Sequence, residues 1–202
     1  MMAELRSFIF LDRLQPQTMC YLGSWVRGAL PRAGYAAQII EVAPGLDIEP
    51  LTDVALKHAD VGAGILFVER QFGYLEIHGP TSAVRSAAGA VLDQLGKSAA
   101  DATSPQILAS RVVPKIDRQH AFLINRNKVG SMALPGQSLF VLEMQPASYA
   151  ILATNEAEKA ARITVVDYRM VGATGRVYLT GTESEVRAAA EAAEAALRSV
   201  TS

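Results

Sequence analysis

The 202-residue chain is short of the features that mark several classes of protein. It has one cysteine, Cys20, so no disulfide can form within the chain. Its formal net charge is −1, which argues against a nucleic-acid partner and against an anionic membrane surface. Charges interrupt its apolar runs well before the ~20 residues that a membrane span needs. Residues 1–6 lack the basic and apolar regions of a secretory signal, so we expect a cytoplasmic protein with no membrane partner.

The patterns on which most active sites are built are also missing. His58, His78 and His120 have no metal-ligand spacing with one another or with Cys20, which we expect to be a buried or idle thiol. Gly62-Ala63-Gly64 lacks the spacing of a nucleotide-binding loop. No nucleophile and base, and no pair of acids, stand at a diagnostic spacing. We therefore expect neither an enzyme nor a resident metal or cofactor.

An internal repeat is what the sequence does contain. Residues 53–95 align with residues 155–197 without a gap, at a constant shift of 102 positions. The matches include two glycines, a Val-Arg pair and an alanine-rich segment, and alanine alone would not produce them. The chain therefore carries two copies of one unit.

A second block of matches lies upstream of the first. Arg6 and Asp12-Arg13 match Arg111 and Asp117-Arg118, but at a shift of 105 positions. The two shifts predict a length change in the segment between the blocks, where loops absorb insertions at little cost.

Length and composition fit two folded domains. Half of the residues are apolar and 19% are charged, and ~100 residues are enough to bury a core. The stretch Lys97–Pro105 is rich in Ser, Ala and Thr, which is typical of a linker. We therefore expect one domain at residues 1–100 and a second at 106–202.

Hydrophobic patterning predicts the same order of elements in each half. Two apolar segments, the first of them strand-like, precede a strand, a helix, two more strands and a last helix. This order predicts an α/β (α+β) fold in which helices cover a sheet. The segments are Ser7–Leu11, Met19–Leu22, Ala37–Val42, Ile48–Ala59, Ile65–Val68, Tyr74–His78 and Ser82–Leu95 in the first half, and Arg111–Ile116, Ala121–Ile124, Ser138–Glu143, Ala147–Ala161, Ile163–Tyr168, Arg176–Thr180 and Ser184–Val200 in the second.

Two of these segments carry a family resemblance. Val54-Ala55-Leu56-Lys57-His58-Ala59-Asp60-Val61 and Glu156-Ala157-Glu158-Lys159-Ala160-Ala161-Arg162-Ile163 resemble the helix-to-strand segment of the bacterial microcompartment shell domain. In that family a strand, a glycine-containing pore loop, a second strand ending in Gly and an Ala-rich helix follow. In the second half these places are filled by residues 164–168, 171–175, 176–181 and 186–197.

The order of elements also resembles one subtype of the family. The usual domain ends with a strand after its last helix, whereas here Val112–Asp117 resembles that strand moved to the front. This resembles the tandem subtype with two circularly permuted, ferredoxin-like domains. The resemblance implies a homotrimer whose six domains form a pseudohexagonal tile, trimers that can stack in pairs, and other shell proteins as partners.

The same resemblance implies a central pore, and the repeat shows which residues would line it. A shift of 102 places Gly172, Ala173 and Thr174 opposite Arg70, Gln71 and Phe72. Relatives with gated pores carry a Glu-Arg pair in the first loop, as Glu69 and Arg70 do. The resemblance therefore implies a gate for small metabolites, with these residues as candidates: Glu69, Arg70, Gln71, Phe72, Gly172, Ala173, Thr174 and, as a hinge, Gly73.

Three alternatives remain open at this point. Glu69 and Arg70 could form an exposed pair at a hairpin tip, worth ~0–1 kcal/mol and without a role. The whole protein could be a small-molecule-binding regulatory protein, because tandem α/β domains also occur in ligand sensors. An enzyme is the third alternative, and the sequence offers it no catalytic set.

Overall fold

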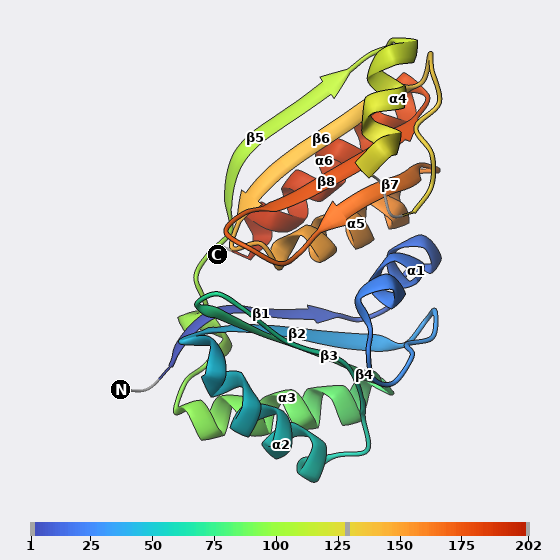
Figure 1. Ribbon diagram of the computed structural model, residues 1–202. Helices are drawn as coiled ribbons and strands as arrows, with labels where there is room; N and C mark the ends of the chain where they lie inside the picture. The colour runs from blue at the N-terminus through green and yellow to red at the C-terminus, as the bar shows by residue number, and fades with distance from the viewer. Residues whose placement is uncertain (1–2, 128–129, 201–202) are drawn as a thin grey trace. The chain divides into compact units, whose positions relative to one another are not determined.

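The computed structural model describes residues 3–127 and 130–200 of the chain. The chain divides into two compact units, Met1–Ser104 and Pro105–Ser202. Each unit is built around its own four-stranded antiparallel sheet, with helices packed on it (Figure 1). The α/β fold expected from the sequence is confirmed.

The first unit has the strand order β1-β2-β4-β3. Its central strands are β2 and β4, and a 3-10 turn, Gly45–Asp47, precedes its second helix. In chain order its elements are β1 (Glu4–Leu11), α1 (Pro16–Trp25), β2 (Ala36–Ala43), α2 (Ile48–His58), β3 (Gly62–Glu69), β4 (Phe72–Gly79) and α3 (Thr81–Leu95).

The second unit repeats this order, with strands β5-β6-β8-β7. Its elements are β5 (Gln106–Val113), α4 (Arg118–Asn127), β6 (Ser138–Gln145), α5 (Tyr149–Ala160), β7 (Thr164–Arg169), β8 (Gly175–Gly181) and α6 (Glu183–Ser199).

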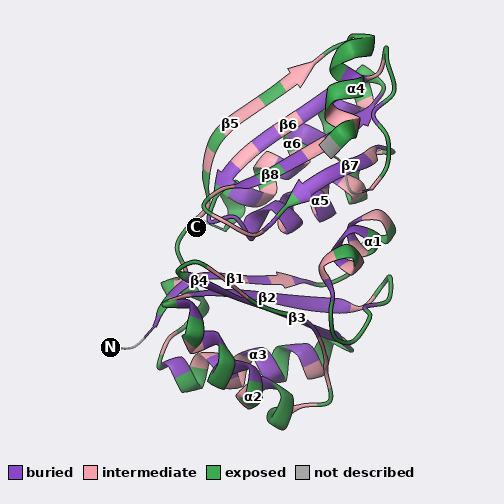
Figure 2. Cartoon of the chain, in the orientation of Figure 1, coloured by how far each residue is buried: buried purple, intermediate pink, exposed green. Residues whose placement is uncertain are grey.

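The main core of the first unit lies between one face of its sheet and the helices α2 and α3 (Figure 2). Leu51 of α2 and Val91 of α3 pack there against Ile40, Leu75 and Ile77 of the sheet. Apolar residues recur on α3 at intervals of three and four, which places them on one side of the helix and buries that side. The predicted core face of this helix is confirmed.

A shorter helix packs on the opposite face of the sheet. In the second unit, Ala121 and the partly buried Ile124 of α4 join Leu139 of β6 and Val166 of β7 in a separate apolar cluster. The apolar segments Met19–Leu22 and Ala121–Ile124, whose type the pattern left open, therefore belong to the helices α1 and α4.

The structural repeat has one shift, 102 positions, along its whole length. The strand pairs β1–β2 and β5–β6 have matching registers and matching irregularities, between Leu5 and Ser7 and between Ile107 and Ala109. Cis peptide bonds precede Pro44 and Pro146, which are also 102 positions apart. The predicted shift of 105 in the upstream block is wrong. The hydrogen-bond ladder sets the register of a strand, and a few identical residues at another spacing do not change that register.

The first strand of the second unit also begins earlier than expected. The pattern predicts Arg111–Ile116, whereas β5 runs from Gln106 to Val113. Pro114 ends it because proline has no N–H for the ladder, and Lys115 turns the chain with a positive φ of 48°.

Candidate functional site

The first candidate pore loop is the tight hairpin between β3 and β4. Glu69 pairs with Phe72, so Arg70 and Gln71 form a two-residue tip. Arg70 has a positive φ of 55° and Gln71 does not, the sign pattern of a type II′ turn, in which the first position usually holds glycine. An arginine therefore occupies a backbone position that disfavours any side chain.

The side chains at this tip extend into solvent. Arg70 has a side chain 89% exposed, and its Nε lies 3.7 Å from Oε1 of Glu69, which is partly exposed. An ion pair this long and this exposed contributes ~0–1 kcal/mol, so it does not hold Arg70 in place. Within one chain the guanidinium is therefore able to change partners.

Phe72, by contrast, is anchored to the body of its domain. Its ring lies under the guanidinium of Arg6 on β1, with Cζ 4.1 Å from the ring centroid, and it is buried. Nε of Arg6 donates a 2.8 Å hydrogen bond to Oε1 of Glu41, a fully buried residue of β2. This stack of cation and ring attaches the base of the hairpin to the sheet.

The sequence patterns did not identify Arg6 or Glu41 as residues that hold the loop. For Glu41 a signal existed, because it aligns with Glu143 at the shift of 102. No local pattern connects Arg6 with Phe72, since the two residues are 66 positions apart and meet only in the folded sheet.

The second candidate loop connects β7 and β8, and it is built differently. Its strands stop earlier, leaving Met170–Thr174 as a five-residue connection in which Gly172 has a φ of 118°. Thr174 Oγ1 donates a 2.9 Å hydrogen bond to Oε1 of Glu143, and Nε of Arg176 donates to the same oxygen at 3.1 Å. The hydrogen bond from Thr174, followed by that from Arg176, lowers the pKa of Glu143 below its ordinary value.

Gly73 lies inside β4, where it pairs with Val42 and Val68. A Cβ atom at this position would overlap the carbonyl oxygen of Gly45. Gly175 has the same relation to the carbonyl oxygen of Ala147 in the second unit. Close packing therefore explains both glycines, and the predicted hinge at Gly73 is not needed to account for either.

The remaining candidates from the sequence do not gather into one site. Cys20 is exposed on α1, so the buried alternative is wrong, and His58 is the last residue of α2. His78 is buried, with Nδ1 2.9 Å from Oε1 of Glu76. Within residues 3–127 and 130–200 no group of three or more His, Cys, Asp and Glu side chains is arranged to hold a metal ion. None of the described helices has the length and apolar character to cross a membrane.

Comparison with known proteins identifies both halves of the chain. Residues 5–101 match the family described as the CsoS1D N-terminal domain, and residues 138–202 match the BMC domain family. The carboxysome shell protein CcmP of Synechococcus elongatus is 44% identical over 198 residues, which cover 98% of this chain and 93% of CcmP. The carboxysome shell protein CsoS1D of Hydrogenovibrio crunogenus is also 44% identical, over 99% of this chain and 98% of its own.

Solved structures agree with these relatives in fold over nearly the whole chain. A shell protein of the RMM microcompartment, described as fused, permuted and hexameric, is 72% identical, with a TM-score of 0.97 and coverage of 98% of both chains. A second protein of that compartment, described as a double-ringed trimeric shell protein, is 44% identical, with a TM-score of 0.94 and coverage of 98% of this chain and 97% of its own.

Proposed function

The chain belongs to the bacterial microcompartment shell protein family, and we propose that three copies of it form a pseudohexameric tile with a gated central pore. It carries two tandem BMC-type domains, each with the circularly permuted order of elements. Its place is the microcompartment shell, and its role there is structural and not enzymatic.

The observation that carries the proposal is the difference between the two hairpin loops. Threefold symmetry places three copies of each loop around one axis, so each short loop becomes a ring. In the first loop, Glu69 and Arg70 extend into solvent from a tight tip. In the second, Gly172 and Ala173 offer no charge. Three charged tips and three small neutral loops would alternate around the pore.

Such a ring allows two arrangements of its charged side chains. Three guanidinium groups near one axis repel one another unless a carboxylate lies between them, and Glu69 of a neighbouring copy can supply one. Arginine–carboxylate hydrogen bonds are charge-assisted and often bidentate, so Arg70 and Glu69 from adjacent copies would close the pore. When each Arg70 returns to the loose pair with its own Glu69, the pore opens. A small metabolite that interacts with one arrangement only would shift the balance.

Phe72 has a different part in this scheme from the one that the sequence suggests. Because Arg6 holds its ring against β1, Phe72 fixes the base of the hairpin while Arg70 and Gln71 move. The opening of the gate would then involve side-chain rotation at the tip without displacement of the strands.

The assembly would have further partners of its own kind. Tiles joined edge to edge with other shell proteins would enclose the compartment, and stacking of two trimers face to face would create a space between two gates. The solved relatives described as hexameric and as double-ringed support rings of this sort.

The proposal is tested by molar mass and by a structure of the assembled protein. Sedimentation equilibrium should give three times the chain mass of 21.6 kDa for a single trimer, or six times that mass for a stacked pair, and a stable monomer would exclude the tile. In the assembled structure Arg70 should lie beside the threefold axis, and Arg70→Ala should widen the pore without changing the oligomer. Arg70 positioned far from that axis would end the gate hypothesis while leaving the tile intact.

A further inference from the structure

A buried acid–base pair lies on β4, outside the candidate pore loops. Glu76 is fully buried and His78 is 3% exposed, and Nδ1 of His78 lies 2.9 Å from Oε1 of Glu76. The second carboxyl oxygen of Glu76, Oε2, has no hydrogen-bond partner among the residues that the structure describes. A buried carboxyl with one unpartnered oxygen is costly, so the pair needs an explanation other than packing.

Two glycines of the neighbouring strand β3 make room for this pair. A Cβ atom at Gly62 would lie 2.7 Å from Nε2 of His78, and a Cβ atom at Gly64 would overlap Oε2 of Glu76. Gly64 is also the unpaired residue of a bulge in β3. The backbone of β3 therefore passes close to both side chains, at positions where any other residue would have to displace them.

The internal repeat shows that these four residues belong together. In the second unit all four differ: larger residues replace the two glycines, and uncharged residues replace the acid and the base. At the shift of 102 the equivalents are Thr164 for Gly62, Val166 for Gly64, Tyr178 for Glu76 and Thr180 for His78.

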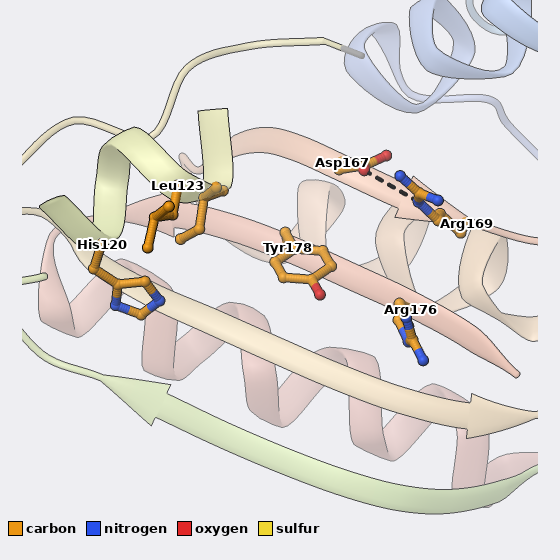
Figure 3. Close-up of a pocket in the computed structure, with 7 residues that line it drawn as sticks. His120, Leu123, Asp167, Arg169, Arg176 and Tyr178 are labelled. Carbon is orange, nitrogen blue, oxygen red and sulfur yellow. Dashed lines mark ion pairs between the residues drawn. The ribbon is translucent and has the colours of Figure 1, made fainter. Parts of the chain in front are cut away.

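The same positions of the second unit form an apolar contact. Val166 belongs to the cluster beneath α4, and Tyr178 packs against that cluster (Figure 3). The strand pairs β3–β4 and β7–β8 have matching registers and matching bulges. The shared fold therefore does not require the acid–base pair, which is a property of the first unit alone.

Residues 26–29, which follow α1, are attached to β3 beside the pair. The three backbone amides of residues 27–29 donate hydrogen bonds of 2.9–3.2 Å to the carbonyl oxygens of Ala63 and Gly64. These bonds end at the bulge, next to Oε2 of Glu76. The 26–29 segment is therefore held by β3 at the place where the pair is buried.

The unpartnered oxygen of Glu76 lies close to this segment. The point at which a Cβ atom of Gly64 would overlap Oε2 is 3.1 Å from the carbonyl oxygen of Ala29 and 3.1 Å from Cγ2 of Val26. Neither of these atoms donates a hydrogen bond, so they favour a protonated carboxyl over a carboxylate ion. Burial raises the pKa of Glu76, and the hydrogen bond and charge of His78 oppose that rise.

The ionisable side chains on the surrounding elements have other contacts. Arg27 of the 26–29 segment donates to backbone carbonyl oxygens. Tyr35, before β2, has its ring centroid 6.5 Å from that of His78 and 6.0 Å from the guanidinium of Arg32. The others are Glu41 of β2, which is bonded to Arg6 of β1, the exposed Asp60 before β3, and Cys20 and Tyr21 of α1. None of these contacts involves Glu76, so His78 is the group that balances a charge on its carboxyl.

We propose that Glu76 and His78 form a proton-operated latch that keeps the 26–29 segment closed on β3. With one shared proton the buried pair has no net charge, and the segment stays closed. Loss of that proton leaves a buried carboxylate beside a neutral imidazole, and water reaches this anion when the segment opens. The closed state thus binds a proton that the open, hydrated state releases, so closure weakens as the pH rises. This inference depends on contacts within the first unit and not on the proposed trimer or gate.

Hydrogen exchange at the amides of residues 27–29 tests the latch. Loss of one proton changes an equilibrium constant by up to about tenfold per pH unit. After correction for the intrinsic exchange rate, the opening constant of the wild type should therefore rise at least about tenfold from about pH 6 to about pH 8.5. The amides of Ile116 and Gly136, which make loop hydrogen bonds in the second unit, are the internal control and should show a constant opening equilibrium.

Two variants separate the titration of Glu76 from a general effect of pH. Glu76→Gln keeps the shape of the side chain but cannot lose a proton, so the pH dependence at residues 27–29 should disappear. Glu191→Gln changes an exposed glutamate of α6 and should behave as the wild type. Equal pH dependence in Glu76→Gln and in the wild type would overturn the latch.

Infrared spectroscopy gives a readout that needs no variant, in case Glu76→Gln does not fold. Exposed carboxyl groups are ionised above about pH 6, so a remaining carboxylic acid band reports a buried protonated carboxyl. This band of the wild type should decline over the same pH range as the protection of residues 27–29. Protection that is independent of pH, or that is lost while the band persists, would refute the proposal.

Discussion

Arg70 and Gly172 occupy the same position in the two copies of the repeat, and both have positive φ angles, 55° and 118°. The left-handed backbone at the tip of each loop therefore favours glycine, and only the second loop has a glycine at this position. A left-handed conformation costs a residue with a Cβ roughly 1–2 kcal/mol. The first loop bears this cost to present a long cationic side chain at the point where the proposed pore closes.

Arg70→Gly should stabilise the protein by ~0.5–1 kcal/mol, because the relief of backbone strain exceeds the added freedom of the unfolded chain. The same change removes the proposed gate. Urea unfolding at fixed protein concentration measures the first effect. Gln71→Gly is the matched control at the next position, where φ is not positive, and it should destabilise the protein.

Gly73→Ala and Gly175→Ala should each destabilise their domain by ~2–3 kcal/mol. In both cases the new Cβ overlaps a backbone carbonyl oxygen, which cannot move away as the end of a side chain could. Gly89→Ala supplies the contrast, since nothing lies within 4 Å of a Cβ there and α3 gains ~1 kcal/mol of helix propensity. Equal tolerance of all three alanines would refute the close-packing explanation.

Arg6→Met should destabilise the first domain by ~3 kcal/mol, because the buried carboxylate of Glu41 loses its guanidinium partner. The hairpin should loosen as well, since Phe72 loses the cation that covers its ring. Denaturant unfolding reports the first effect, and faster hydrogen exchange at the amide of Phe72 reports the second.

A double-mutant cycle separates these two effects. Arg6→Met combined with Glu41→Leu should recover much of the stability, because an apolar pair replaces an ion pair without an orphaned charge. Exchange at Phe72 should stay fast in the double variant. Recovery of both quantities together would mean that the cation does not anchor the ring.

Thr174→Val should raise the pKa of Glu143 toward the ordinary glutamate value of 4.5, since the hydrogen bond from Thr174 is the largest cause of its depression. A depressed pKa in the folded state contributes stability above the unfolded pKa, and this contribution is lost as the pH falls through the folded pKa. The wild type should therefore lose more stability than the variant between neutral pH and pH values below 4.5. Carboxyl NMR titration and unfolding at several pH values measure the two quantities.

Much of this architecture could be predicted from the sequence, because it depends on local patterns. Residues at intervals of three and four predicted the core face of α3, and alternation predicted the strand pair β3 and β4, although β4 is buried at every position and not only on alternate residues. The ungapped alignment of residues 53–95 with 155–197 placed Arg70 opposite Gly172, a pairing that the backbone angles confirm. The resemblance to microcompartment shell domains is likewise confirmed.

Other features needed the tertiary structure. A few identical residues suggested a shift of 105 in the upstream block. Strand register, however, depends on the hydrogen bonds between β1 and β2, and the equivalent bonds between β5 and β6 follow the shift of 102. The stacking of Arg6 on Phe72 likewise joins β1 to β4, far apart in the chain.

The sequence by itself determined that this protein has two copies of one domain, and that the copies differ at the proposed pore. Only the tertiary structure decided how each loop is held, by Arg6 in the first unit and by Glu143 in the second. The physical reason is that periodicity and propensity act over a few neighbouring residues, whereas burial and pairing depend on residues that only folding brings together.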